Sequence, residues 1–416
     1  MADEDLRRLE REATANDPAA CMRYAGALER EGRRAEAARA LRRAIDSEAA
    51  REVLAGYPAW AHPWATAGRA RSLDVEPVVA RPRVLWTAKV DHGPGLSSSQ
   101  TAWSSHRLLA SPLGVVCATD RGVVVLDPDS GAERWHRNWA KRALAGGSPW
   151  RPQLEIHGQT LLVWNGDALW RNDLATGKAH GELRAPWATQ ALLDRGLLVA
   201  VEEDAIVARS VGREAQGEEL WRAPRPRGEL VLAAAEDQVF IWSQGVIAAH
   251  DRSSGEERWQ EFGSATFLAD REGLVTLAED PPRLELRDAK GQPVRRIEEG
   301  TWAFALTRDL VVVGVGGAQA VAVVERASGA QTMLPALRAA GAPIVARDVI
   351  YGATDEACSR LGACRASGEQ LWGLDLPRPT GRGARSERSG VAALALLDRM
   401  VFAIVGETTL VALTDL

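Results

Sequence analysis

The sequence predicts a mainly β fold, an eight-bladed β-propeller with a small α-helical hairpin before it. Three observations predict it. A unit made of an alternating strand, an Asp, a short polar turn, a Gly and a second strand occurs seven times, at a period of roughly forty residues. A hairpin pattern of two apolar strands occurs eight times. The last unit stops before its turn, and a matching strand lies near the N-terminus.

The repeated unit is clearest in "GVVVLDPDSGAERW" (122–135) and "GVIAAHDRSSGEERWQ" (245–260). Its Asp is expected to accept hydrogen bonds from backbone N–H groups of the turn, and its Gly to supply a left-handed conformation. The turn glycines are Gly131, Gly177, Gly217, Gly255, Gly291, Gly329 and Gly368. A Trp on the following strand is expected to cover the face between neighbouring blades; these are Trp135, Trp221, Trp259, Trp372 and the displaced Trp86.

The hairpin pattern counts the blades independently. It places an apolar strand, a polar turn and a second apolar strand before each repeated unit and before the unfinished one. The second strands begin near Val115, Leu161, Leu197, Val239, Leu274, Leu310, Val349 and Val401. Each blade should therefore have four short strands, and the ring should have eight blades.

The incomplete last unit indicates a closed ring. The segment "VFAIVGETTLVALTDL" (401–416) ends at the position of the turn, and the Trp-bearing strand that should follow appears as "RVLWTAKV" (83–90). An open solenoid would gain nothing from this split. A ring closes by pairing the N-terminal strand with the last blade, which leaves no exposed sheet edge.

The alternating strand, Asp-x-x-x-Gly turn and Trp of "AAHDRSSGEERW" and "VVLDPDSGAERW" resemble the pyrroloquinoline-quinone-like propeller repeat. The resemblance covers residues 82–416. It implies the fold of quinoprotein dehydrogenases and of the lipoprotein propeller of the bacterial outer-membrane assembly machine. In the dehydrogenases it implies a funnel that holds the quinone and calcium, often with adjacent cysteines. Here Cys21, Cys117, Cys358 and Cys364 are never adjacent and the blades are nearly minimal, so we expect no cofactor.

Residues 1–56 are expected to be helical and similar to one tetratricopeptide-type hairpin. Asp17-Pro18 is a good helix start, and Tyr24, Leu28 and Leu41 lie on the predicted apolar faces. A single hairpin cannot bury its own apolar face, so it should dock either on the propeller or on a partner protein. The Pro-rich linker 57–81 contains Trp60 and Trp64 and is expected to lie against a surface.

Composition excludes several classes of function. The net charge of −5 argues against a nucleic-acid partner. The charged N-terminal segment has no signal-peptide pattern, and no run of eighteen apolar residues predicts membrane insertion. Four cysteines do not suggest a disulfide framework. These features predict a cytoplasmic protein.

No catalytic motif is found in the sequence, so we expect no enzyme and no metal site. Cys358 and Cys364 flank a predicted hairpin across which they could face one another; they are interpreted as ordinary thiols, with metal binding or oxidation as the alternative. The arginine-rich connection 377–390 is interpreted as a solvated connector, with contact to an acidic partner as the alternative.

Tryptophans supply the candidate binding residues of the propeller. Trp103, Trp150, Trp187 and Trp302 precede predicted inner strands, and Trp139 follows the first blade. They either cap the packing between blades or form an aromatic recognition rim for a peptide or protein.

Together these features predict a non-catalytic protein–protein interaction scaffold or adaptor of a cytoplasmic bacterial multi-component system. Its partners should be other proteins, bound through the tryptophan rim or through Tyr24, Leu28 and Leu41, and a small-molecule ligand is not expected. An envelope assembly factor, a small-ligand sensor and a quinone-dependent enzyme are the alternatives.

Overall fold

The computed structural model describes most of the chain. The described residues are 3–13, 17–60, 72–90, 107–118, 122–138, 153–164, 168–184, 190–212, 217–279, 282–297, 300–315, 320–339, 343–377, 391–405 and 409–416.

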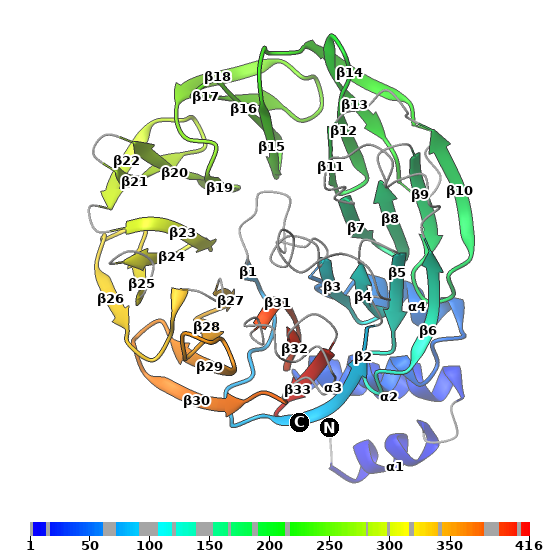
Figure 1. The fold of residues 1–416 in the computed structure, drawn as a ribbon. Helices are drawn as coiled ribbons and strands as arrows, with labels where there is room; N and C mark the ends of the chain where they lie inside the picture. The colour runs from blue at the N-terminus through cyan, green and yellow to red at the C-terminus, as the bar shows by residue number, and fades with distance from the viewer. Residues whose placement is uncertain are drawn as a thin grey trace, which may run out of the picture.

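Eight antiparallel four-stranded arrays surround a central axis, as predicted (Figure 1). The innermost strands of blades 1 to 8 are β3 (Arg107–Ser111), β7 (Gln153–His157), β11 (Gln190–Asp194), β15 (Leu230–Ala235), β19 (Phe267–Asp270), β23 (Gly300–Leu306), β27 (Ile344–Ala346) and β31 (Val391–Leu397). The second strands are β4 (Gly114–Ala118), β8 (Thr160–Trp164), β12 (Leu197–Val201), β16 (Gln238–Ser243), β20 (Gly273–Glu279), β24 (Leu310–Val315), β28 (Val349–Ala353) and β32 (Met400–Val405).

The third strands are β5 (Gly122–Leu126), β9 (Ala168–Asp173), β13 (Ala205–Ser210), β17 (Val246–Asp251), β21 (Pro282–Asp288), β25 (Ala320–Glu325), β29 (Arg360–Arg365) and β33 (Thr409–Thr414). The outermost strands are β6 (Glu133–Asn138), β10 (Ala179–Arg184), β14 (Glu219–Pro224), β18 (Glu257–Phe262), β22 (Pro293–Ile297), β26 (Gln331–Leu334), β30 (Gln370–Asp375) and β2 (Arg83–Lys89). The second strands are almost entirely buried and the third strands largely so, which explains why their sequences are apolar runs bounded by polar turns.

The ring closes as the sequence predicts. Strand β2 pairs antiparallel with β33, from Arg83 opposite Thr414 to Lys89 opposite Thr409. Both strands lie side by side in Figure 1 although they come from opposite ends of the chain. This pairing supplies the fourth strand of blade 8.

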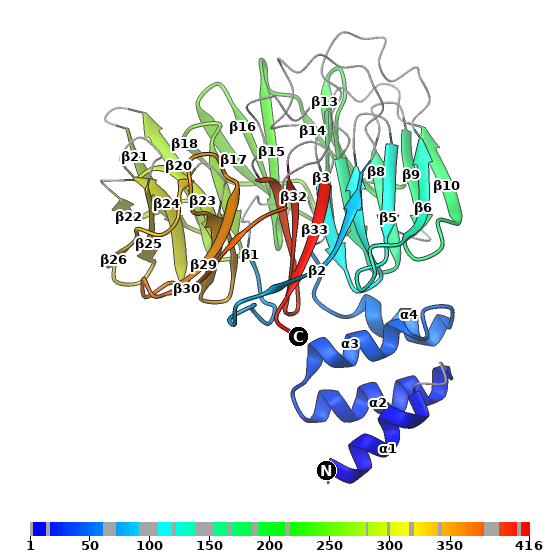
Figure 2. The ribbon, with the colours of Figure 1, turned by 60° about the horizontal axis from the view of Figure 1, so that its bottom comes forward.

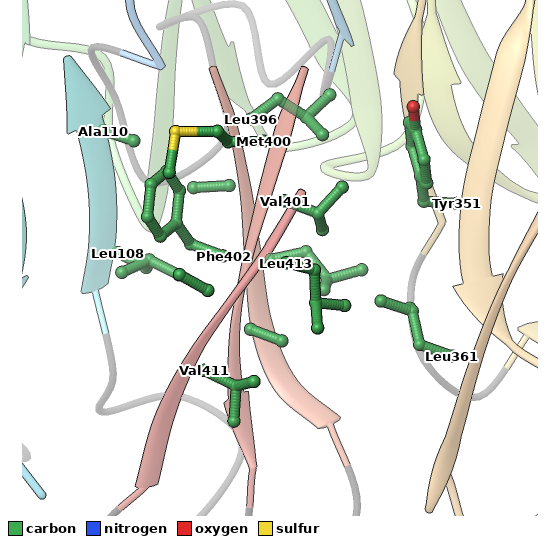
Figure 3. Close-up of a cluster of buried hydrophobic side chains, with 14 of the residues drawn as sticks. Leu108, Ala110, Tyr351, Leu361, Leu396, Met400, Val401, Phe402, Val411 and Leu413 are labelled. Carbon is green, nitrogen blue, oxygen red and sulfur yellow. The ribbon is translucent and has the colours of Figure 1, made fainter. Parts of the chain in front are cut away.

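Side chains that alternate along each strand fill the spaces between blades. In blade 8, Phe402 and Met400 point toward Leu108 of blade 1, whereas Val401 points the other way, toward Tyr351 of blade 7 (Figure 3). Successive residues of a strand face opposite sides, so one apolar strand contributes to two interblade cores. The core is therefore continuous across the closure of the ring.

The Trp and Gly of the repeat connect neighbouring blades. Trp86 of blade 8 lies against Gly131 of blade 1, where a Cβ would be 2.6 Å from two indole carbons, and its Nε1 donates to the Pro128 carbonyl at 2.9 Å. Gly131 has φ +69°, and Asp127 accepts the N–H groups of the turn. The same contact is made by Trp135 with Gly177, Trp221 with Gly255 and Trp259 with Gly291. The expected interblade role of these residues is confirmed.

The turn missing from blade 8 is supplied by the linker. The N–H groups of Val79 and Ala80 donate to Asp415, as those of a normal turn donate to its Asp. The Val78 carbonyl accepts Nε1 of Trp372 at 3.0 Å, as the Pro128 carbonyl accepts that of Trp86. The last unit is thus completed by residues 78–81 as well as by β2, so the contacts of blade 8 begin before residue 82.

Among the described residues, four helices precede the ring: α1 (Asp3–Ala13), α2 (Pro18–Arg30), α3 (Arg34–Arg42) and α4 (Glu48–Ala55). Asp17 caps α2 by accepting the N–H groups of Ala19 and Ala20, as its Asp-Pro start predicts. The helices lie under one face of the ring (Figure 2). In the described part of the chain, no helix is long and apolar enough to cross a membrane.

The helices dock on the propeller of the same chain. Their buried side chains share one apolar cluster with blades 1 and 2, in which Leu41 and Leu54 join Leu113. Arg42 makes two hydrogen bonds to Asp129 at 2.6 and 2.8 Å, and Arg34 makes two to Asp398 at 2.7 and 2.6 Å. The sequence left two docking surfaces open, the propeller and a partner protein. In the structure the helices dock on the propeller.

The linker also pairs with innermost strands. Trp60, which is fully buried, exchanges two backbone hydrogen bonds with Ala110 of β3 at 2.7 and 3.1 Å. Further on, β1 (Ser72–Leu73) pairs in parallel with β27 and makes blade 7 five-stranded. The linker therefore contacts innermost strands of blades 1 and 7 on both sides of its undescribed residues 61–71.

Candidate functional site

A cavity of about 1050 Å³ opens at the centre of the ring. We call it the central cavity. Its wall consists of the hairpin turns that join the first and second strands of blades 2 to 7, together with β1. The equivalent turns of blades 1 and 8 contain Leu113 and Asp398, which contact the helical segment or its core. The cavity and the helices therefore lie on the same side of the propeller.

Small side chains keep the cavity open. Ala234 and Ala235 end strand β15, and Ala269 lies near the end of β19. Ile156 and Leu306 also border the cavity, but their side chains are buried between the blades. Alanine at these positions leaves room at the axis, where the ends of the innermost strands converge.

Charged pairs surround the cavity. Arg195 contacts Glu236 of the next blade at 3.3 Å, and Arg347 contacts Asp74 of the linker at 2.8 Å. These side chains are about half exposed or more. Exposed ion pairs contribute little to stability, typically 0 to about 1 kcal/mol. Their value lies in presenting arginine and carboxylate groups to solvent.

A second set of arginines, which do not line the cavity, stabilises the turns that form its wall. Arg252, in the third turn of blade 4, contacts Asp194 in the first turn of blade 3. Arg326 of blade 6 contacts Asp270 of blade 5 in the same way, at 2.6 Å. Burial raises the pKa of Asp270, and the Arg326 guanidinium opposes that shift. These ion pairs are largely shielded from water and fix the position of the cavity wall.

Glu155 is the most perturbed group in the wall. It lies on β7, is 1% exposed, and accepts the N–H of Gly196 at 3.1 Å. Burial, reinforced by the nearby Asp194, raises its pKa to about 8. His157 Nδ1 lies 3.8 Å from the Glu155 carboxyl, and burial lowers the pKa of that imidazole. At neutral pH both groups are therefore mostly uncharged, and they form a neutral polar patch in the wall.

The sequence interpretation did not select Glu155. Its only signal is an acidic residue in the middle of an otherwise apolar segment, "QLEIH". His157 is the last residue of β7 and directly precedes the hairpin turn. Outside the cavity, His250 contacts the carbonyl of its turn glycine, Gly255, at 3.0 Å.

The predicted tryptophan rim is not described by the structure. Trp103, Trp139, Trp150 and Trp187 lie outside the described residues. The backbone of Trp302 belongs to β23, but its side chain is outside the description. The arginines of the connection 377–390 also lie outside the described residues. The rim and the connection therefore stay predictions.

The three helical candidates are described and buried. Tyr24 is 6%, Leu28 0% and Leu41 1% exposed, and all belong to the core shared by the helices and blades 1 and 2. They hold the helical segment together and against the ring. We therefore do not retain them as contacts for a partner.

The four cysteines are free and buried. Burial raises the pKa of the Cys364 thiol to about 11, and that of Cys358 is raised for the same reason. Thiols with raised pKa values are poor nucleophiles and poor metal ligands at neutral pH. Among the residues that the structure describes, no group of three or more His, Cys, Asp and Glu side chains is arranged to hold a metal ion.

Comparison with known proteins agrees with this fold. A family profile described as "Outer membrane protein assembly factor BamB" matches residues 119–365 and 210–416, which together span well over half of the chain. The chain belongs to the BamB family. No curated protein sequence matches this BamB-family chain.

Solved structures similar to this BamB-family chain include a BamB protein and two dehydrogenases. These represent the two classes of propeller that the repeat resembles. BamB from Moraxella catarrhalis has a TM-score of 0.54 at 13% identity, and the match covers 80% of this chain and 99% of that one. A europium-containing methanol dehydrogenase has a TM-score of 0.56 at 11% identity and 87% and 99% coverage. Quinohemoprotein alcohol dehydrogenase from Comamonas testosteroni has 0.57 at 12% identity and 89% and 82% coverage. At these identities the similarity shows the fold alone.

The central cavity of this BamB-family chain does not fit a pyrroloquinoline quinone. Among the residues that the structure describes, its wall contains eight acidic side chains against four arginines. Among those arginines, Arg195 and Arg347 already face carboxylates. The quinone is itself a polycarboxylate, so it would need converging cationic groups, and the described part of the wall does not offer them. No chemical step is assigned to a quinone there.

Proposed function

We propose that this protein is a non-catalytic protein–protein interaction scaffold or adaptor. The observation that supports it is the central cavity, a wide opening surrounded by arginine–carboxylate pairs and held by a closed, rigid ring. Arginine is enriched at protein interfaces, and charged rims of both signs select partners by electrostatic complementarity. A rigid site binds with little loss of conformational entropy.

The partners in this proposal are other proteins of a cytoplasmic bacterial multi-component system. The four free, buried thiols suit a reducing compartment. The cavity is also larger than many small-ligand pockets, which span about 300 to 1000 Å³. The size of the cavity favours a protein segment over a small molecule as the ligand.

A second function, assembly of envelope proteins, is favoured by the family match. The matching profile is described as an outer membrane assembly factor. Cell fractionation with an antibody to the native protein separates the two. Recovery with soluble cytoplasmic markers supports the cytoplasmic adaptor, and recovery with envelope markers supports the assembly factor.

Affinity purification from the native organism tests the scaffold itself. The wild-type chain should retain specific protein partners. Arg308→Glu, which reverses a 72% exposed charge at the cavity, should reduce their recovery. Arg184→Glu reverses an 86% exposed charge on the outer strand β10 and serves as the matched control, which should change nothing. If no protein is specifically recovered with the wild-type chain, the scaffold proposal is wrong.

A further inference from the structure

The chain itself shows that innermost strands of this propeller accept an additional strand. Strand β1 pairs with β27, from Ser72 opposite Val345 to Leu73 opposite Ala346. The Ser72 hydroxyl also donates to the Leu306 carbonyl at the end of β23. Trp60 pairs with Ala110 of β3 in the antiparallel sense. The free edge of an innermost strand is therefore accessible to extended backbone in either direction.

Other innermost strands reach the same cavity. Ser72, Leu73 and Asp74 form one side of its wall, and the ends of β11, β15 and β19 form another. In the described part of the chain, each of these three strands has a pairing partner on one side only. An edge strand leaves every second N–H and C=O group available for pairing.

Strand β15 offers the most suitable edge. It has six residues, Leu230–Ala235, and its last residues line the cavity with methyl groups only. A segment laid beside it would pass between β11 and β19, the neighbouring innermost strands. The small side chain of Ala235, the last residue of the strand, leaves room for that passage.

The charges of the wall are largely balanced. Arg252, Arg326 and Arg365 contact Asp194, Asp270 and Asp348 from outside the lining, in addition to the pairs within it. Glu155 is mostly protonated at neutral pH because its pKa is raised. A strongly charged segment would find no excess of opposite charge, so the backbone is expected to provide most of the contacts.

We propose that the central cavity binds an extended, weakly charged segment of a partner protein, which adds a strand to the free edge of β15. This inference rests on the proposed scaffold function and specifies how the partner is held. Backbone hydrogen bonds supply the affinity, and the small side chains of the wall select alternating small and apolar residues.

The test uses the full-length protein and a fluorescent peptide in which threonine and valine alternate. A second peptide has the same sequence with every other backbone nitrogen methylated, which removes the N–H donors of one edge. Fluorescence anisotropy should show binding of the first peptide and a loss of about tenfold or more for the second. Equal binding of the two peptides would overturn strand addition, as would no binding of the first.

The place at which the peptide binds is tested with Ala235→Trp, which fills the cavity beside β15. Ala132→Trp, on an exposed turn of blade 1, is the control. Peptide binding should be lost in the first variant only, and binding that survives in it would overturn the placement. The peptide comparison does not depend on either variant. If native partners are recovered equally by wild type and Ala235→Trp, the scaffold stands and this binding mode fails; if wild type recovers none, the scaffold itself fails.

Discussion

The contact between Trp86 and Gly131 offers a quantitative test of ring closure. Trp86 belongs to the strand that joins the N-terminal part of the chain to blade 8, and Gly131 belongs to the turn of blade 1. In Gly131→Ala, the new methyl group would lie 2.6 Å from the indole carbons Cδ2 and Cε3. Because the indole is itself packed and hydrogen-bonded, it cannot move without loss.

Two costs add in this variant. An alanine at φ +69° costs about 1 to 2 kcal/mol relative to glycine, and overpacking costs typically about 1 to 3 kcal/mol. We therefore expect Gly131→Ala to lower the free energy of unfolding by about 2 to 5 kcal/mol. Gly245→Ala is the matched control. Gly245 also has a positive φ, +83°, but a Cβ there meets nothing within 4 Å, so only the first cost applies.

A double-mutant cycle isolates the contact. Trp86→Ala alone should cost about 3 to 5 kcal/mol by removing a buried aromatic side chain. In that background, Gly131→Ala should cost only the conformational term, so the two losses should fall short of additivity by about 1 to 3 kcal/mol. Urea-induced unfolding of the four proteins measures these values. Additivity within about 0.5 kcal/mol would show that Trp86 does not lie on Gly131, and the closure described here would be refuted.

Three further predictions concern single contacts. Glu155 keeps its proton in the folded protein up to about pH 8, whereas the unfolded chain releases it near pH 4.5, so this carboxyl destabilises the fold as pH rises between those values. Glu155→Gln should therefore raise Tm over wild type more at about pH 9 than at about pH 5; an equal effect would contradict the buried acid. Asp129→Ala leaves the 5% exposed Arg42 side chain without that carboxylate and should weaken helix docking by about 2 kcal/mol, seen as faster proteolysis of residues 1–56. Tyr351→Phe removes the oxygen that accepts the Val78 N–H at 2.7 Å and should speed hydrogen exchange at that amide about tenfold; unchanged exchange would contradict it.

The ring could be predicted because its signals are local. Each Asp-x-x-x-Gly turn requires its own hydrogen bonds and its own positive φ, so the pattern appears in full within a few residues of sequence, as in 127–131. The displaced strand was found because Trp86 repeats the position of Trp135 and Trp259 in the unit. The blade count and the closure followed from these local patterns, and the structure confirms both.

The site could not be predicted in the same way, because its residues are far apart in the sequence and come together only when the ring has formed. Ser72 and Leu73 form a strand of two residues with no sequence pattern of their own, and it exists because β27 offers an edge. Val79 and Ala80 act as turn residues for an Asp more than three hundred positions later in the chain. Tyr24, Leu28 and Leu41 were candidate contacts for a partner because they lie on an apolar face. In the structure that face belongs to the core shared with blades 1 and 2 of the propeller.

The completion of the last blade by residues 78–89 has a consequence for biosynthesis. Strand β2 leaves the ribosome long before β33, with which it pairs, has been translated, and the partners of Val78, Val79 and Ala80 also come hundreds of residues later. The helices face the same delay, because Asp129 and Asp398, which anchor them, also come later. In a nascent chain, residues 78–89 must therefore stay unpaired until the final strand, β33, has emerged from the ribosome. A prematurely terminated chain would retain two open edges, which marks it for recognition by chaperones and proteases.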